Sequence, residues 1–283
     1  MSMQTKEKLT GTGNNLETIM RKKKFIFIAG LCVIENEEMT FEVAQKLKEI
    51  TSKYDDVEFI FKASFDKANR TSGDSYRGVG MYEGMKILQN IKNELGIKVL
   101  TDVHHPYQAN IAMDTIDVIQ IPAFLCRQTD LVTAVGKTGK TVNIKKGQFI
   151  APEDVRHIIM KLKATGNQNI MITERGTCFG YHNLIVDYRS FLILKEFGYP
   201  VIFDATHSQQ KPSADGKQTG GNRDYVIPMA CGAIATGADG LFVECHPYPP
   251  EAKSDSATSL YLEDIEKLLE RVMKIWRVTN EKS

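Results

Sequence analysis

Residues 200–208 read PVIFDATHS, a short apolar run followed at once by polar and ionisable side chains. The run is apolar almost without a break, which is typical of a parallel strand buried on both faces. The same pattern recurs along the chain, and longer segments with helical periodicity separate the runs. The strand-like runs are Phe25–Gly30, Val57–Ala63, Ile97–Asp102, Asp117–Pro122, Thr141–Lys145, Asn169–Glu174, Pro200–Asp204 and Gly240–Glu244.

Helical periodicity marks the segments that follow these runs. The last of them, Leu262–Trp276, places a stripe of apolar side chains on one helix face. Strands alternating with helices over about 250 residues predict an α/β fold, a (β/α)8 TIM barrel, and an open doubly wound sheet is the competing architecture. We expect residues 1–24 to form a polar N-terminal extension and residues 25–283 a single catalytic barrel domain. The other helical segments include Glu37–Lys53, Asp130–Gly139, Pro152–Ala164 and Asp187–Phe197.

The composition of the 283 residues excludes several classes of protein. Basic and acidic side chains nearly balance, 36 against 35, so no broad positive field favours nonspecific binding of nucleic acid. No apolar run approaches the roughly 20 residues that span a bilayer. The first residues lack the apolar segment of a signal peptide. The five cysteines are scattered without CxxC spacing, so we expect no disulfide framework, and we interpret Cys126, Cys178, Cys231 and Cys245 as core or packing residues. We therefore expect a cytoplasmic protein that binds small molecules rather than nucleic acid or membrane.

Each strand-like run is followed by polar or ionisable side chains. In a parallel barrel the carboxyl ends of all strands meet at one rim, where barrel enzymes keep their catalytic groups. A purely structural barrel has no need for such groups after every strand, so the pattern favours an enzyme. The groups near the ends of the successive runs are Cys32, Lys62, Asp102, Gln120, Lys145, Arg175, His207 and Glu244.

Positive side chains gather at this rim although the whole chain is close to neutral. Cations held together against their mutual repulsion indicate a highly charged anionic ligand, such as two phosphorylated groups. Lys62 or Lys145 could instead form a Schiff base, and any single cation could belong to a surface ion pair. The cations are Lys62, Lys67, Arg70, Arg127, Lys145 and Arg175.

A second group at the rim combines side chains that suit a metal ion. Cys32 follows the first run, His207 the seventh, Glu244 ends the eighth and Asp255 lies in the last loop. The first, seventh and eighth strands are neighbours in a closed barrel, so these side chains can meet. A thiol, an imidazole and two carboxylates suit a divalent ion such as Zn²⁺, Fe²⁺ or Mn²⁺, without selecting among them. Alternatively, Cys32 is a small buried apolar residue and Glu244 only accepts hydrogen bonds.

Five longer segments resemble one enzyme family. They are KASFDKANRTS (62–72), IQIPAFLCRQTDL (119–131), NIKKGQF (143–149), TERGTCFGYHNLIVDYRS (173–190) and DATHS (204–208). Together they resemble the 3-deoxy-D-manno-octulosonate 8-phosphate synthase family, over a match from about Phe25 to Ile275. The sister family, 3-deoxy-D-arabino-heptulosonate 7-phosphate synthase, shares the barrel and the chemistry but typically has KPRTS where this chain has KANRTS.

The resemblance implies a reaction, a cofactor and an assembly. The family condenses phosphoenolpyruvate with D-arabinose 5-phosphate and water, releasing inorganic phosphate, in the synthesis of a lipopolysaccharide precursor. The family has a metal-dependent branch, marked by a Cys after the first strand, and a metal-independent branch, marked by an Asn at that position. Cys32 therefore implies one divalent ion per site, with His207, Glu244 and Asp255 as the other ligands. The family also implies a homotetramer.

The same motifs imply roles for individual residues. Lys145, His207 and Asp255 are the expected catalytic residues, and which group activates the water stays open. Arabinose 5-phosphate is expected to bind Asn69, Arg70 and Thr71. Phosphoenolpyruvate is expected to bind Lys62, Lys67, Gln120, Lys145 and Arg175.

Some positions depart from the family pattern. Leu31 stands where the family usually has Pro, and Gly73-Asp74 replaces an apolar residue followed by His. The Gly-, Ser- and Lys-rich loop Ser208–Asn222 is expected to close over the bound sugar. Two alternative functions are a heptulosonate synthase that uses erythrose 4-phosphate and a barrel that binds a phosphorylated ligand without turnover.

Overall fold

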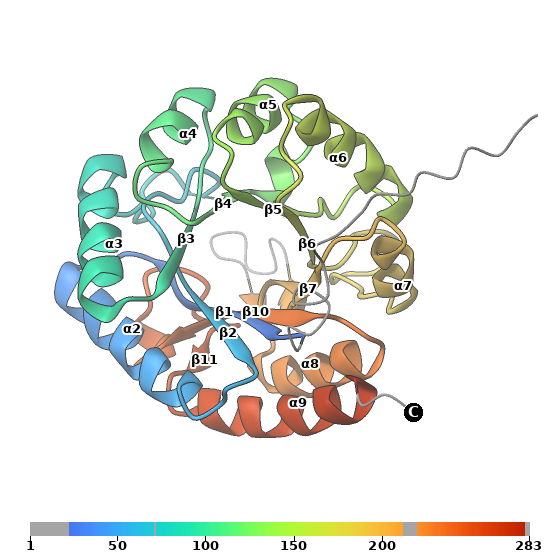
Figure 1. The fold of residues 1–283 in the computed structure, drawn as a ribbon. Coiled ribbons are helices and arrows are strands. Elements are labelled where there is room, and N and C mark those ends of the chain that lie inside the picture. Colours follow the sequence, from blue (N-terminus) through green and yellow to red (C-terminus); the bar gives the residue numbers. More distant parts are fainter. Residues whose placement is uncertain (1–22, 71, 212–219, 281–283) are drawn as a thin grey trace, which may run out of the picture.

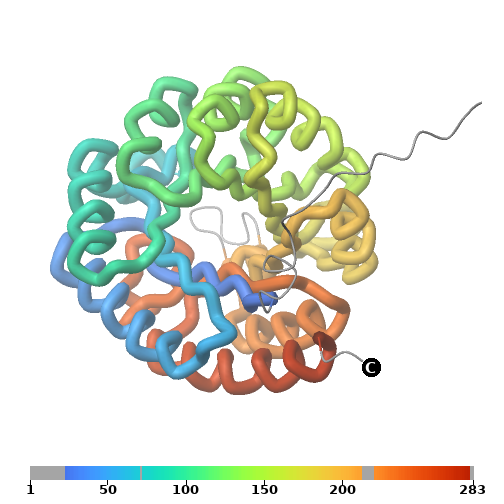
Figure 2. Tube along the Cα trace, in the orientation of Figure 1, coloured from blue at the N-terminus to red at the C-terminus, as the bar shows by residue number. Residues whose placement is uncertain are grey.

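The computed structural model describes residues 23–70, 72–211 and 220–280. Most of the expected N-terminal extension, Thr71 and the middle of the loop Ser208–Asn222 lie outside these residues. The described chain forms a ring of helices around a central cylinder of strands (Figure 1). Figure 2 shows that the chain runs once around this ring, so that its blue beginning lies beside its orange and red end. In the described part of the chain, no helix is long and apolar enough to cross a membrane.

Parallel strands close the cylinder. Consecutive strands pair from β1 to β7, β7 pairs with β10, and β10 pairs in parallel with β1. The predicted TIM barrel is therefore confirmed. The alternative of an open sheet is wrong, because in an open sheet the first and last strands do not pair, whereas β1 pairs with β10 here. The strands are β1 (Phe25–Val33), β2 (Val57–Ser64), β3 (Lys98–Asp102), β4 (Val118–Ile121), β5 (Thr141–Lys145), β6 (Ile170–Glu174), β7 (Val201–Asp204) and β10 (Gly240–His246).

The expected helices form, with ends that differ by a few residues. The last helix begins at Asp264 rather than Leu262, because the Leu262 amide donates to the His246 carbonyl and keeps the chain against β10. The helices are α2 (Glu37–Thr51), α3 (Met81–Leu95), α4 (Pro106–Ala112), α5 (Thr129–Lys137), α6 (Val155–Ala164), α7 (Arg189–Lys195), α8 (Val226–Ala235) and α9 (Asp264–Asn280).

The connections after β7 and β10, at the carboxyl end of the barrel, carry short strands of their own. After β7, the short strands β8 (Gln210–Lys211) and β9 (Gly220–Gly221) pair with each other in antiparallel orientation. A 3-10 turn, η4 (Arg223–Tyr225), then leads into α8. After β10, the 3-10 turn η5 (Pro249–Glu251) and an irregular segment lead to β11 (Leu260–Tyr261), which pairs with the end of β10.

The alternation of side chains along the strands delivers polar groups to one end of the barrel. Successive strand residues point to opposite faces, so every second residue faces the barrel interior. An apolar cluster fills that interior, separate from the larger core between strands and helices, and it contains Ile28, Ile60, Leu100, Val118, Met171, Ile202 and Phe242. The residue two positions further on lies one layer nearer the rim. After Gly30 on β1, these positions hold Lys62, Asp102, Gln120, Thr173, Asp204 and Glu244.

Candidate active site and metal centre

A cavity opens at the carboxyl end of the barrel, directly above this polar layer. Cys32 lies beside the cavity in contact with Asp255, and Thr71 lies outside the described residues. The structure thus brings together almost all of the side chains that the sequence places in the site. Those that line the cavity are Lys62, Lys67, Asn69, Arg70, Gln120, Lys145, Arg175, His207, Glu244 and Asp255.

The charge of the cavity differs in two ways from the predicted cluster of cations. Arg127 is exposed and is not among the lining residues, because the 3-10 turn η1 (Ala123–Leu125) intervenes between β4 and this residue. Acidic side chains also stand among the other cations, so the positive excess is smaller than the cations alone suggest. These acids are Asp102, Asp204, Glu244 and Asp255.

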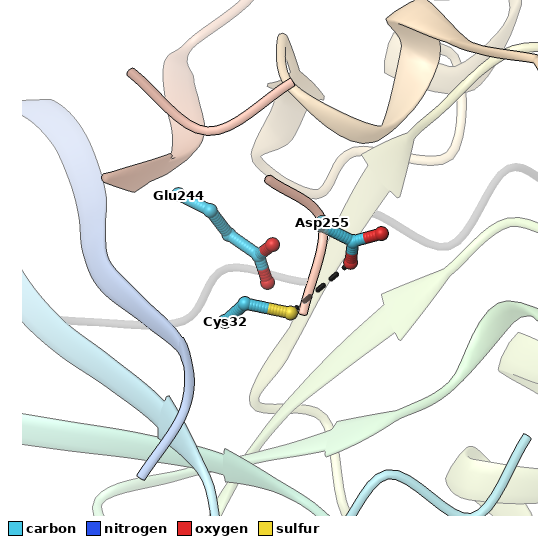
Figure 3. Close-up of side chains that lie close together, drawn as sticks. All are labelled: Cys32, Glu244 and Asp255. Atoms are coloured by element: carbon cyan, nitrogen blue, oxygen red, sulfur yellow. Dashed lines mark hydrogen bonds between the residues drawn. The ribbon is translucent and has the colours of Figure 1, made fainter. Parts of the chain in front are cut away.

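The predicted metal ligands converge where β1 and β10 meet. Figure 3 shows Cys32, Glu244 and Asp255 pointing toward one another, and one ligand atom from each lies within 4.8 Å of the others. The Cys32 thiol donates to Asp255 Oδ2 at 3.0 Å. His207 borders this group, with its Nε2 3.5 Å from Glu244 Oε1 and 3.6 Å from Asp255 Oδ2, but it is not one of the three residues whose ligand atoms all lie within 4.8 Å of one another. Residues far apart in the sequence therefore present sulfur, nitrogen and oxygen to one small volume.

Glu244 carries an observation that favours a cation at this place. Its Oε1 accepts a hydrogen bond from Lys62 at 2.6 Å, whereas its buried Oε2 has no hydrogen-bond partner among the described residues. Burial raises the pKa of the Glu244 carboxyl. The positive groups around it outweigh this effect, so the pKa lies well below its usual range; they are His207, Lys62, Lys67 and Lys145. A buried, ionised carboxylate with a free oxygen is a suitable ligand for a divalent ion.

Lys62 donates hydrogen bonds that fix the positions of Cys32 and Glu244 in the metal-ligand group. Its ammonium donates to Glu244 and to the carbonyls of Leu31 and Cys32, at 3.1 and 2.8 Å, which engages the three donors of a lysine. Gly30 permits this close approach of β1 to β2, because a Cβ there would lie 2.0 Å from the Lys62 carbonyl oxygen. The departure at Leu31 leaves the anchor intact, since Lys62 uses the backbone carbonyl. The role of Lys62 in binding phosphoenolpyruvate stays a prediction.

The Cys32 thiol is protonated unless a cation is present. Burial, and then the negative charges of Asp255 and Glu244, raise the pKa of Cys32 well above its usual value, although Lys67 and Lys62 act in the opposite direction. A metal ion supplies the positive charge that stabilises a thiolate. The site therefore fits a cation that displaces the thiol proton.

His207 is oriented by the residues that surround its other nitrogen. Asp204 Oδ2 lies 2.9 Å from His207 Nδ1 and 2.6 Å from Lys145 Nζ. The other ring nitrogen, Nε2, lies on the side of the metal-ligand group, 3.5 Å from Glu244 Oε1. The Asp204 carboxylate also accepts from the His207 amide at 2.9 Å. The spacing of three residues in DATH is the sequence signal for this partner, which was not among the predicted site residues.

Lys145 is buried between this pair and an aromatic ring. Its ammonium lies 3.9 Å from the centre of the Phe242 ring and 3.3 Å from His207 Nδ1. Burial lowers the pKa of Lys145, and the negative charges of Asp204 and Glu244 only partly offset this. A lysine shifted in this direction exchanges its proton more readily at neutral pH than an exposed one.

Arg175 lines the cavity and has one donor without a partner among the described residues. Its Nη2 donates to the His207 carbonyl at 3.0 Å and to Gln210 Oε1 at 2.7 Å, whereas its buried Nε has no partner among the described residues. Gln210 in turn donates to Asp255 Oδ1 at 2.8 Å. A guanidinium with a spare donor suits an anionic ligand, and Gln210 is a site residue that the sequence did not reveal.

The opposite side of the cavity is formed by the loop after β2. Asn69 and Arg70 line it, and Arg70 donates to the Tyr76 carbonyl at 2.8 Å and to Ser254 Oγ at 2.8 Å. Asp74, one of the departures from the family pattern, is exposed. Of the predicted sugar-phosphate residues, Asn69 and Arg70 therefore line the cavity, and Arg70 contacts the segment that carries Asp255.

The remaining cysteines differ in their surroundings. The described cysteines are free thiols, in agreement with the expected absence of a disulfide framework. Cys126 and Cys245 are buried, as expected for packing residues. Cys178 is exposed, so its expected place in the core is wrong: it lies in an irregular loop after β6.

Comparison with known proteins identifies relatives over almost the whole chain. A sequence profile of the DAHP synthetase I family matches residues 11–280. A curated protein of Fusobacterium nucleatum is 52% identical over 257 residues, which cover 91% of this chain and 92% of the relative. A protein of Desulfatibacillum aliphaticivorans is 51% identical over 263 residues, 93% of this chain and 96% of the relative. One of Protochlamydia amoebophila is 48% identical over 257 residues, 91% and 93%. All three relatives are named 2-dehydro-3-deoxyphosphooctonate aldolase.

Proposed function

The chain belongs to the DAHP synthetase I family, and we propose that it acts within this family as a 3-deoxy-D-manno-octulosonate 8-phosphate synthase of the metal-dependent branch. It joins phosphoenolpyruvate to D-arabinose 5-phosphate. A bond forms between C3 of phosphoenolpyruvate and the aldehyde carbon, water supplies the C2 oxygen of the product, and the C2–O bond to phosphate breaks. The protons of the water go to the former aldehyde oxygen and to the departing phosphate. The observation that carries the proposal is the cavity in which cations face a thiol–carboxylate–imidazole group.

Phosphoenolpyruvate is assigned to the part of the cavity lined by Arg175, Lys145 and Lys67. Arg175 supplies the donor that is left unpaired at Nε, and Lys145 and Lys67 add positive charge. Gln120 lies on the cavity floor, where Asn143 donates to its Oε1 at 3.1 Å and fixes the orientation of its amide. Lys62 contributes charge, because its donors are already engaged. This surrounding is suited to a small ligand with a phosphate and a carboxylate.

Arabinose 5-phosphate is assigned to the side formed by the loop after β2. Arg70 keeps part of its guanidinium for a phosphate, since three of its five N–H groups are used by Tyr76, Ser254 and Lys253. Asn69 lies beside it on the cavity wall. Placing the phosphate here sends the aldehyde end of the sugar toward the metal-ligand group.

The metal would be held by Cys32, His207, Glu244 and Asp255, whose donor atoms suit Zn²⁺, Fe²⁺ or Mn²⁺. When bound, a divalent ion supplies Lewis-acid polarisation of a substrate oxygen. The residues of the chain perform the remaining work. Lys145, with its lowered pKa, can hold or deliver a proton beside His207, and Asp204 keeps the His207 ring in place.

A substrate comparison tests the proposed reaction. Purified protein is given phosphoenolpyruvate with either arabinose 5-phosphate or erythrose 4-phosphate, and inorganic phosphate is measured. We expect phosphate release with the five-carbon sugar to exceed that with the four-carbon sugar by at least tenfold. The isosteric variant Lys145→Met, which loses the ammonium, is the control for contaminating phosphatase. Preference for erythrose 4-phosphate would favour the heptulosonate reading, and no release with either sugar would favour a binding barrel without turnover.

The cellular setting belongs to the same proposal. A product of this kind feeds lipopolysaccharide synthesis, and its substrates are small cytoplasmic phosphates, so we place the enzyme in the cytoplasm. We also propose a homotetramer, which is supported by exposed aromatic rings on loops near the rim, Phe124, Phe149 and Phe179. Light scattering on the purified protein tests the assembly, and a monomeric mass would reject it.

A further inference from the structure

Two arginines donate hydrogen bonds to the segment that carries Asp255, one to residues before Asp255 and one to residues after it. Before Asp255, Arg70 donates through Nη1 to Ser254 Oγ at 2.8 Å and through Nη2 to the Lys253 carbonyl. After Asp255, Arg223 donates through Nη2 to the Ser256 carbonyl at 2.5 Å and through Nε to the Ser259 carbonyl. The two arginines come from different connections, the loop after β2 and the turn η4 before α8. The metal ligand thus lies between two anchors.

The segment needs such anchors because regular structure does not fix it. Asp255 lies between η5 and β11, and it is the only residue other than glycine with a positive φ, 48°, in the described ranges. This conformation is unfavourable for a side chain with a Cβ and persists only when its surroundings enforce it. The Asp255 carbonyl accepts from the amides of Thr258 and Ser259 at 3.1 and 3.0 Å, which closes a tight turn directly after the ligand.

The connection that carries Arg223 also packs closely on this turn. Gly221 lies so near that a Cβ there would be 2.2 Å from Thr258 Cγ2, and Thr258 is buried. The Arg223 guanidinium is itself held over the Tyr261 ring, 4.8 Å from its centre. The anchor is therefore a fixed part of the structure rather than a loose surface side chain.

We infer that Arg223 is a positioning residue for the metal ligand Asp255, so that metal affinity depends on this anchor as well as on the four ligands. The inference rests on the metal site in the proposed function. A planar guanidinium can bind two carbonyls of one turn at once, and a lysine cannot reproduce that geometry. Because Asp255 Oδ2 lies 3.0 Å from the Cys32 sulfur, a small shift of the turn changes the distance between two ligands.

Arg223 allows a cleaner test than Arg70. Arg70 lines the cavity and is assigned to the sugar phosphate, so its variants change substrate binding as well. Arg223 is not among the lining residues, and its described contacts are with the Asp255 segment and Tyr261. A change in metal affinity in an Arg223 variant can therefore be measured without any substrate.

The experiment measures metal binding by Arg223→Lys and Arg223→Met. Metal-free protein is titrated with Zn²⁺ against a chromophoric chelator, and with Co²⁺ while the thiolate-to-cobalt absorption is recorded. We expect binding about 10- to 100-fold weaker than in the unchanged chain, the range found for residues that orient a ligand, with the thiolate absorption retained at saturation. Wild-type affinity in both variants would overturn the inference.

Two further variants separate positioning from a general loss of stability. Arg277→Lys is the matched control, because Arg277 also stacks on a tyrosine, Tyr54, and binds the Asp56 carboxylate at the other end of the barrel. It should leave metal affinity unchanged, and equal weakening by Arg277→Lys would reject the special role of Arg223. If the Arg223 variants fail to fold, Gly221→Ala displaces the same turn through Thr258 and should weaken binding as well; wild-type affinity there would count against the inference.

The proposed reaction and this inference can fail separately. A chain that binds metal tightly, loses affinity in Arg223→Lys and does not consume arabinose 5-phosphate would leave the inference standing and reject the reaction. A chain that consumes both substrates but shows no change of metal affinity in the Arg223 variants would do the reverse.

Discussion

The Cys32 thiol lies close to two carboxylates, so the protonation state of this single residue depends on whether a cation is bound beside it. Its pKa is raised by burial first and by Asp255 and Glu244 next, so a bound cation is what makes the thiolate favourable. Asparagine, which marks the metal-independent branch that the family resemblance describes, needs no proton loss at this position. Whether this position holds Cys or Asn therefore distinguishes a site that binds a metal ion from one that does not.

Substitution of Cys32 tests this dependence. Cys32→Ala should lose metal affinity by more than the about 10- to 100-fold typical of removing an orienting partner, and activity should fall with it. Cys32→Asn should retain part of the activity, and that activity should resist chelation. The measurements are metal titration and phosphate release with and without a chelator. Unchanged wild-type activity after complete removal of metal would contradict the assignment of Cys32.

Asp102 gives a prediction for acid stability. Burial raises its pKa, but the hydrogen bond from His104 at 3.0 Å and the charges of His104, Lys67 and Lys62 hold that pKa well below the usual range. A depressed carboxyl pKa stabilises the fold above the unfolded pKa of about 4, and this stabilisation is lost as pH falls through the folded pKa. Asp102→Asn should lower the free energy of unfolding by about 1–3 kcal/mol at pH 7 and by less at pH 3. Urea unfolding at both pH values measures it, and an equal difference at both would refute it.

At the scale of elements, the strands can be predicted from the sequence, but the residues that support the site from the loops cannot. The run at 240–244 predicts β10 to within a few residues because a continuous apolar segment has one suitable place, buried on both faces. The acid that orients His207 and the anchor at Arg223 depend on how loops fold back over the rim, which no periodicity in the sequence records. The prediction that Arg127 belongs to the cluster of cations at the rim fails for the same reason, because its spacing after β4 does not reveal the intervening turn η1.

The first helix after β1 offers a test of element stability away from the site. Asn36 Oδ1 accepts from the Met39 amide at 2.8 Å and caps α2, whose first turn also carries Glu37 and Glu38. Asn36→Ala removes the cap and should destabilise the protein by about 1 kcal/mol. Asn36→Asp, which keeps an acceptor, is the matched control and should be close to neutral. Thermal unfolding measures both, and equal losses in the two variants would argue against the cap.

For the whole molecule, the metal-ligand group joins the first and last parts of the barrel. Cys32 lies near the end of β1, Glu244 lies on β10 and Asp255 lies after it, so an ion there would tie together the seam at which the cylinder closes. Binding to the folded chain alone stabilises it, by about 2.7 kcal/mol when free metal is 100 times its dissociation constant.

Chelation should therefore lower the unfolding temperature by several degrees, and stoichiometric Zn²⁺ should restore it. Cys32→Ala is the control, because its unfolding temperature should respond little to either treatment. Differential scanning calorimetry of the holoprotein before and after chelation measures the shift. An equal response of Cys32→Ala and the unchanged chain would place the stabilising ion elsewhere.

The closure of β1 against β10 also has a consequence for the order in which the protein is made. Cys32 leaves the ribosome early, whereas Glu244 and Asp255 emerge only after some 200 further residues have been synthesised. Until then Lys62 has no carboxylate partner from β10, and the Cys32 thiol has neither of the two carboxylates beside it. An ion held by all four proposed ligands would therefore be captured only at the final stage of synthesis, when the last strand docks on the first.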